Sequence, residues 1–207
     1  MTQEIKALVK NLKNRKIKGY AVKTRKEALK KVLSMVPGGA SVGTGGSQTL
    51  NEIGLIDALK KRRVKFINKP QKNLSREKVL EKRRKSIIAD YFLMSSNAIT
   101  KDGILINIDG YGNRLAALSF GAKNVIVIVG KNKIVKDIDE GIKRIQPGVV
   151  IKNAKRLGWE TPCLKKGKCI SSGCYPIKRM CNETLIIEGS NEKDRIKVII
   201  VAEDLGY

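Results

Sequence analysis

The sequence predicts an α/β fold, in which helices flank a mostly parallel sheet. Segments with helical hydrophobic periodicity alternate along the 207-residue chain with short apolar runs of strand length, and this alternation is typical of parallel sheets built from crossover units. The runs at 125–129 and 198–202 lack polar alternation, as expected of strands covered on both faces. Hydrophobic residues make up 42% of the chain, which suffices for a substantial core. We therefore expect one domain over residues 1–207.

Helices are predicted from spacing and from start and stop signals. Residues 4–16 carry apolar side chains at helical spacing, Thr24 and Glu27 form a capping box that opens a second helix, and Pro37 ends that helix. The expected helices are residues 4–16, 24–36, 50–62, 74–86, 113–120 and 137–145.

Strands are predicted at the apolar runs between these helices. The expected strands are residues 20–22, 40–42, 64–67, 89–94, 104–108, 125–129, 184–187 and 196–202. A polar turn at 189–194 joins the last two of them. Residues 152–183 are rich in lysine, cysteine and turn residues, and we interpret them as a cysteine-rich insertion before the last two strands.

Several classes of protein are excluded by what the sequence lacks. There is no histidine, so Ser–His and Cys–His catalysis and histidine-ligated zinc are ruled out. No apolar run approaches the length of a membrane span. The N-terminus lacks the apolar core of a signal peptide, which predicts a cytoplasmic protein. No dinucleotide fingerprint is present, so no dinucleotide cofactor is expected.

The chain is strongly basic, with a formal net charge of +24. Such a charge attracts anions, including nucleic acid, phosphorylated metabolites and other small anionic ligands. The basic residues are spread from end to end, however, and only 4% of the residues are aromatic. A base-stacking surface is therefore hard to build, which disfavours nucleic-acid binding.

A glycine-rich run connects an expected strand to an expected helix. Glycines allow a tight turn that exposes several backbone N–H groups, and a helix N-terminus beside them favours an anion. The spacing matches neither a Walker loop nor a dinucleotide loop, and a purely structural turn capped by a serine is the alternative. The candidate ligand-binding residues here are Gly43, Thr44, Gly45, Gly46, Ser47 and Thr49.

A second polar loop, at 109–114, follows the expected strand at 104–108. Arg114 offers a guanidinium fork for a carboxylate or phosphate, and Asp109 is the candidate general base. Gly112 and Asn113 complete this candidate binding loop. The alternative is a tight turn in which Asp109 binds only backbone groups.

A third loop follows the apolar run at 125–129 and contains Asn132 and Lys133. In an open α/β sheet, ligands bind beyond the carboxyl ends of the strands. We therefore expect this loop to meet the other two at one edge of the sheet, with Asn132 and Lys133 reaching a shared ligand.

All four cysteines lie within nineteen residues near the C-terminus. Four thiolates match a structural zinc site or an iron–sulfur cluster, and neighbouring lysines would favour the thiolate form. No CxxC pair is present, and two disulfides or four free thiols are the alternatives. The candidate metal ligands are Cys163, Cys169, Cys174 and Cys181.

Several of these segments together resemble the LUD-domain family, the lactate-utilisation proteins. They are GSQTLNEIG at 46–54, SNAITKDG at 96–103, NIDGYGNR at 107–114, the segment 125–135 with GKNKIV at its end, the cysteine block, and EDLGY at 203–207.

This resemblance implies a fold similar to ribose phosphate isomerase, glucosamine phosphate deaminase and coenzyme A transferases, in which a comparable loop holds a phosphate or acyl group. It implies a role connected with bacterial L-lactate oxidation beside iron–sulfur proteins as redox partners. It also makes an iron–sulfur cluster the first choice at the cysteines, with zinc as the second.

Three functions are consistent with these features. The first is binding of a small anionic metabolite in lactate-type organic-acid oxidation. The second is an isomerase- or acyl-transfer-like reaction on a phosphorylated or CoA-linked substrate, which needs a carboxylate such as Asp109, Asp102 or Glu52. The third is nucleic-acid binding by the basic surface. Self-association is left open.

Overall fold

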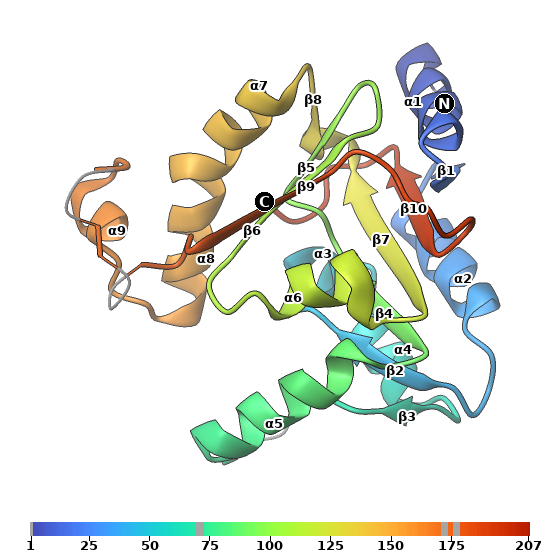
Figure 1. Ribbon diagram of the computed structural model, residues 1–207, viewed down its shortest axis with the longest axis horizontal. Coiled ribbons are helices and arrows are strands. Elements are labelled where there is room, and N and C mark those ends of the chain that lie inside the picture. Colours follow the sequence, from blue (N-terminus) through green and yellow to red (C-terminus); the bar gives the residue numbers. More distant parts are fainter. Residues whose placement is uncertain (1, 69–72, 171–173, 176–178) are drawn as a thin grey trace.

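The computed structural model describes residues 2–68, 73–170, 174–175 and 179–207, which form two sheets with helices around them (Figure 1). The helices are α1 (Gln3–Asn14), α2 (Arg25–Met35), α3 (Gln48–Glu52), α4 (Leu55–Lys60), α5 (Arg76–Ile87), α6 (Asn113–Ala116), η1 (Ala117–Gly121), η2 (Lys131–Lys133), α7 (Ile138–Lys143), η3 (Arg144–Val149), α8 (Val150–Leu157) and α9 (Pro162–Lys166). The strands are β1 (Lys18–Val22), β2 (Ser41–Thr44), β3 (Lys65–Phe66), β4 (Tyr91–Met94), β5 (Ala98–Thr100), β6 (Leu105–Asp109), β7 (Asn124–Gly130), β8 (Ile134–Val135), β9 (Glu183–Ile187) and β10 (Ile196–Val201).

The larger sheet has six strands in the order β1-β10-β7-β4-β2-β3, and every pairing in it is parallel. In the central strand β7, Val125, Val127 and Val129 face one hydrophobic core, whereas Ile126 and Ile128 face another. Both faces of the strand are therefore covered, which explains its unbroken apolar run. The predicted mostly parallel sheet with flanking helices is confirmed.

A second sheet of four strands, in the order β8-β5-β6-β9, was not anticipated as a separate unit. The sequence predicts that 184–187 and 196–202 are consecutive strands joined by a turn. Instead β9 pairs antiparallel with β6, while β10 lies between β1 and β7 in the larger sheet. Their burial accounts for this difference, because β10 is buried along most of its length and β9 is half exposed.

The two sheets and the helices form successive layers. One face of the larger sheet is covered by α2, α3 and α4. Its other face packs against α1, η1 and the inner face of the second sheet. The outer face of the second sheet is covered by α7, α8 and α9, which lie in Figure 1 on the side opposite α1 and α2. No helix among the described residues is long and apolar enough to cross a bilayer.

The segment 152–183, interpreted as a cysteine-rich insertion, begins inside α8. Val150 and Ala154 of this helix are buried against the second sheet, in the same core as Ile106 and Ile108. Cys163 on α9 is buried in that core as well. The first part of the segment is therefore an integral layer of the fold.

Arg195 joins the start of β10 to the end of η1. It is 6% exposed, and its guanidinium donates to the backbone oxygens of Ala122, Leu118 and Ala117 at 3.0, 2.9 and 3.0 Å. These carbonyls lie at a helix end, where acceptors lack helical partners and carry partial negative charge. One planar side chain therefore satisfies three buried acceptors.

Replacing Arg195 by Lys should destabilise the protein by about 2–3 kcal/mol, because an ammonium group cannot reach all three carbonyls and leaves buried acceptors unpaired. Chemical denaturation measures this loss. The exposed Arg76, replaced by Lys in the same way, should change the free energy of unfolding by less than about 0.5 kcal/mol. Equal effects of the two substitutions would contradict the assigned role.

Candidate functional site

A cavity of about 600 Å³ opens where the carboxyl ends of several strands meet. It is lined by residues that follow β2, β4 and β6, by Lys133 after β7, by one side of α8, and by Tyr207. The three loops predicted to meet at one edge therefore all contribute to its wall. The candidate residues among its lining are Thr44, Gly45, Gly46, Ser47, Thr49, Asp109, Asn113, Arg114 and Lys133.

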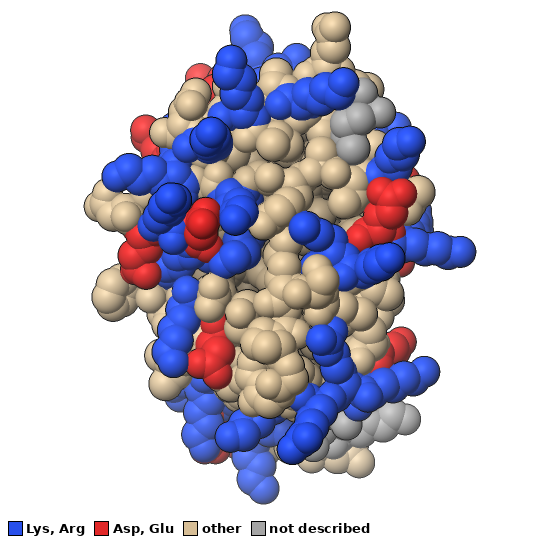
Figure 2. Space-filling view, turned by 90° about the vertical axis from the view of Figure 1, so that its right-hand side faces the viewer, with Lys and Arg blue, Asp and Glu red and all other residues tan. Residues whose placement is uncertain are grey.

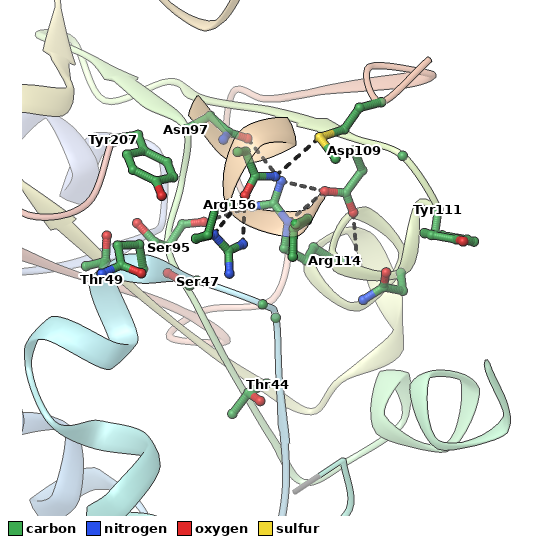
Figure 3. A pocket seen from close by; sticks show the side chains of 18 of the residues that line it. Thr44, Ser47, Thr49, Ser95, Asn97, Asp109, Tyr111, Arg114, Arg156 and Tyr207 are labelled. Carbon is green, nitrogen blue, oxygen red and sulfur yellow. Dashed lines mark hydrogen bonds and ion pairs between the residues drawn. The ribbon is translucent and has the colours of Figure 1, made fainter. Parts of the chain in front are cut away.

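Arg114 is held by a dense set of hydrogen bonds in this wall (Figure 3). Its Nε donates to Asp109 Oδ1 at 2.6 Å, and its Nη1 donates to the Ser95 carbonyl oxygen at 3.0 Å. Its Nη2 donates to Asn97 Oδ1 and to the Ile108 carbonyl oxygen. The guanidinium thus binds the ends of both β4 and β6. Its fork is directed at protein acceptors.

Asp109 is neutralised by the same residue. Besides the Nε contact at Oδ1, its Oδ2 accepts a hydrogen bond from the Arg114 backbone N–H at 3.1 Å. Both carboxylate oxygens are therefore engaged by Arg114. This arrangement fixes the loop between β6 and α6 and directs both carboxylate oxygens at Arg114.

At two positions of the glycine-rich loop, close packing leaves no room for a side chain. A Cβ at Gly43 would lie 2.5 Å from the Ser86 carbonyl oxygen, and one at Gly45 would lie 2.7 Å from Arg114 Cδ. A Cβ at Gly46 would meet no heavy atom within 4 Å. Gly46 is therefore the glycine of this loop that leaves space for a ligand.

Lys133 is buried in the cavity wall, with 4% of its surface exposed. Its Nζ donates to Thr49 Oγ1 and Ser95 Oγ, both at 2.8 Å. Burial, reinforced by the positive charges of Arg144 and Arg114, lowers the pKa of Lys133 to about 7. The cavity therefore contains an amine that is only partly protonated near neutral pH.

The cavity as a whole is positively charged. Its described lining carries five cationic side chains and a single carboxylate, that of Asp109. Arg83 lies toward the outside, 4.6 Å from the ring centre of Tyr111, which in turn contacts Trp159 edge-on. Arg156 projects from α8, where Asn153 accepts two of its hydrogen bonds.

Three of the candidate ligand-binding residues lie outside the cavity lining. Gly43 packs against α5, as described above. Gly112 precedes α6 with a φ of 69°, in the left-handed region that favours glycine. The Asn132 side chain accepts a hydrogen bond from the backbone N–H of Leu205 at 3.1 Å. All three hold backbone in place around the site.

Other residues of the site were not among the sequence candidates. Ser95 and Asn97 directly follow β4, and polar residues after an apolar strand were a usable signal for them. Arg144, which donates to the Asn97 and Asn132 carbonyl oxygens, had no such signal. The same holds for Arg156, because it lies in the segment interpreted as an insertion.

Comparison with known proteins decides the family. A model of the LUD domain matches residues 5–201. The chain belongs to the LUD-domain family. No curated protein sequence matches this LUD-domain protein significantly.

Solved structures similar to this LUD domain include a DUF162-family protein from Deinococcus radiodurans, with a TM-score of 0.55, 15% sequence identity and 97% of each chain covered. Ribose 5-phosphate isomerase A from Neisseria gonorrhoeae aligns with a TM-score of 0.36 and 16% identity over 66% of each chain. A D-ribose-5-phosphate isomerase in complex with phospho-erythronic acid aligns with a TM-score of 0.35 and 16% identity, over 65% of this chain and 66% of that one. The first of these similarities supports the fold.

The four cysteines of the LUD domain are not joined by disulfides. Burial and the neighbouring Cys181 raise the pKa of the Cys174 thiol, and Cys163 and Cys169 act in the same direction. The cysteines are thus near enough to interact electrostatically. Among the described residues, however, no three metal-ligating side chains are placed to hold one ion. As donors, four thiols suit zinc or an iron–sulfur cluster.

Replacing Lys133 by Met should change stability in a pH-dependent manner. Because the pKa of Lys133 is lowered in the folded protein, the unfolded chain binds the extra proton between about pH 7 and about pH 10. Wild-type stability therefore gains about 1.4 kcal/mol for each pH unit across this window, and the variant lacks that gain. The variant should be most stable relative to wild type below about pH 7.

Urea denaturation of both proteins at several pH values measures this difference. The exposed Lys131, replaced by Met, serves as the matched control, with an expected change of less than about 0.5 kcal/mol. A Lys133→Met effect that stays constant with pH would contradict the assigned environment of the amine.

Proposed function

We propose that this LUD-domain protein binds a small organic anion in the cavity between its two sheets. The observation that carries this proposal is the charge of the described cavity lining, whose single carboxylate is already neutralised by Arg114. The lining therefore keeps a positive charge from Arg83 and Arg156. Cations in a partly enclosed site attract an anion more strongly than cations on an open surface.

Neutral donors in the lining complement this charge. The Ser47 hydroxyl accepts a hydrogen bond from the Leu50 N–H, and among the described residues its own O–H has no acceptor. The open space beside Gly46 lets a ligand approach this hydroxyl. A carboxylate or phosphate placed there would accept from Ser47 and lie within the positive field of the cavity.

The family supports an organic acid as the ligand. The resemblance of this chain to lactate-utilisation proteins makes lactate and pyruvate the first compounds to test. We propose that the protein is a cytoplasmic accessory component of such an oxidation, with iron–sulfur proteins as its redox partners.

Titration calorimetry with lactate, pyruvate and ribose 5-phosphate tests the binding site. We expect Arg156→Met and Ser47→Ala each to weaken binding, the first by at least about tenfold, because a charge-assisted hydrogen bond contributes about 1.5–3 kcal/mol. Lys155→Met, on an exposed neighbour in α8 outside the cavity lining, is the matched control and should bind as wild type does. Failure of the wild-type protein to bind any small organic acid would refute the proposal.

The second sequence-based function, an isomerase- or acyl-transfer-like reaction, lacks a suitable base in the described site. Asp109 is occupied by Arg114, and Glu52 accepts a hydrogen bond from the Gly206 N–H at 2.7 Å. Asp102 lies away from the cavity, paired with Arg15. The geometry therefore favours binding over carboxylate catalysis.

The surface gives no particular support to nucleic-acid binding. Figure 2 shows Lys and Arg side chains distributed over the whole visible face, with Asp and Glu side chains among them. A dispersed charge of this kind promotes solubility and weak attraction of anions. Any duplex binding should fall steeply as salt is raised, whereas binding in the cavity should fall only modestly.

We also propose a metal centre at the cysteines. Its support is that all four thiols are free, that the other three raise the pKa of Cys174, and that Arg179 donates to the Cys181 sulfur at 3.4 Å. Protein purified without oxygen should contain one metal centre per chain. Brown absorbance with iron and sulfide identifies a cluster, and colourless protein with one zinc identifies a structural zinc site. Metal-free protein in which all four thiols react with a thiol reagent would refute it.

A further inference from the structure

The hydrogen bonds around Lys133 match a neutral amine. The Thr49 hydroxyl donates to the Leu205 carbonyl oxygen at 3.4 Å, and the Ser95 hydroxyl donates to the Ser96 carbonyl oxygen at 3.2 Å. Both hydroxyl hydrogens are thus directed at backbone, so both oxygens act as acceptors toward Lys133. A neutral amine has two N–H groups to fill these two acceptors. Its nitrogen lone pair has no described hydrogen-bond partner.

The charged groups around Lys133 favour this neutral form. Arg144 and Arg114, which belong to η3 and α6, oppose protonation of the amine. Glu52 on α3 acts in the opposite direction, but it is the weakest of these influences. Asp109 is paired with Arg114. A buried lysine flanked by cations is the usual environment of a lysine that acts as a nucleophile.

We propose that Lys133 condenses with the carbonyl group of a small 2-oxo acid held in the cavity. This inference rests on the proposed function, because the positive charge of the cavity must first hold the carboxylate of the same molecule. It narrows the ligand class from organic anions in general to those with a carbonyl next to the carboxylate. Lactate, which has a hydroxyl at that carbon, can occupy the cavity but cannot react.

The reaction balances without an oxidant or a reductant. The Lys133 nitrogen lone pair forms a bond to the carbonyl carbon, the carbon–oxygen π bond breaks, and one of the two nitrogen hydrogens is transferred as a proton to the carbonyl oxygen. The resulting carbinolamine loses its hydroxyl group as water, with one hydrogen leaving from nitrogen, and a carbon–nitrogen double bond remains. Thr49 and Ser95, both within 2.8 Å of the nitrogen, lie where protons must enter and leave.

Reductive trapping tests this step. The wild-type protein is incubated near neutral pH with pyruvate and sodium cyanoborohydride, and its mass and peptides are then analysed. We expect a single addition, equal in mass to pyruvic acid less one oxygen atom, on the peptide that contains Lys133. Labelling at Lys133 should be at least about tenfold faster than at any exposed lysine, because ordinary lysines are almost fully protonated at this pH.

Three controls make the result specific. Lys133→Met should lose the fast labelling, whereas Lys131→Met should retain it. Lactate in place of pyruvate should give no adduct, and excess lactate should slow labelling by pyruvate. Circular dichroism of Lys133→Met establishes that the loss does not come from unfolding.

The outcomes separate this inference from the proposed function. Pyruvate that binds in calorimetry but leaves Lys133 unlabelled would overturn the inference and leave anion binding intact. Labelling that is spread evenly over exposed lysines would overturn it as well. A protein that binds none of the tested organic acids and is not labelled by pyruvate would contradict both.

Discussion

The Arg114 guanidinium is the interaction on which the site depends. It joins the end of β4 in the larger sheet, through Ser95 and Asn97, to the end of β6 in the second sheet, through Ile108 and Asp109. Four acceptors around one planar cation fix the distance and angle between the two sheets at this edge. Since residues at both strand ends line the cavity, this contact positions two parts of its wall relative to each other.

This contact also explains features that look independent in the sequence. Gly45 has no side chain because Arg114 packs where a Cβ would stand. Position 109 holds an aspartate, whose carboxylate supplies the nearby counter-charge that a guanidinium only 13% exposed needs. The loops at 43–49 and 109–114, which resemble separate anion-binding motifs in the sequence, therefore pack against each other through Gly45 and Arg114. In the proposed function, anion recognition falls to Ser47 of the glycine-rich loop and to Arg83 and Arg156 in other parts of the lining.

The sequence predicted those features of the fold that depend on hydrophobic periodicity and on which residues follow each strand. The parallel sheet and the three converging loops followed from apolar runs such as 125–129. The second sheet did not follow, because β5 and β8 have only three and two residues, too few to show a period. The partners of Arg114 and Lys133 did not follow either, because side-chain pairing between distant segments leaves no local pattern. Arg156 was not predicted as a site residue, because the lysine- and cysteine-rich segment around it was interpreted as an insertion.

Lys133 shows why burial and charge must be considered together. A lysine that is 4% exposed, without a carboxylate among its described hydrogen-bond partners, destabilises the fold when it is protonated. A chain selected for stability alone would place a methionine or leucine there. Two hydroxyls are instead positioned to accept from this amine, and Arg114 and Arg144 lie close enough to weaken its hold on a proton. Several elements therefore cooperate to keep a buried amine of low pKa in the cavity wall, and its proposed reaction with a carbonyl group depends on this arrangement.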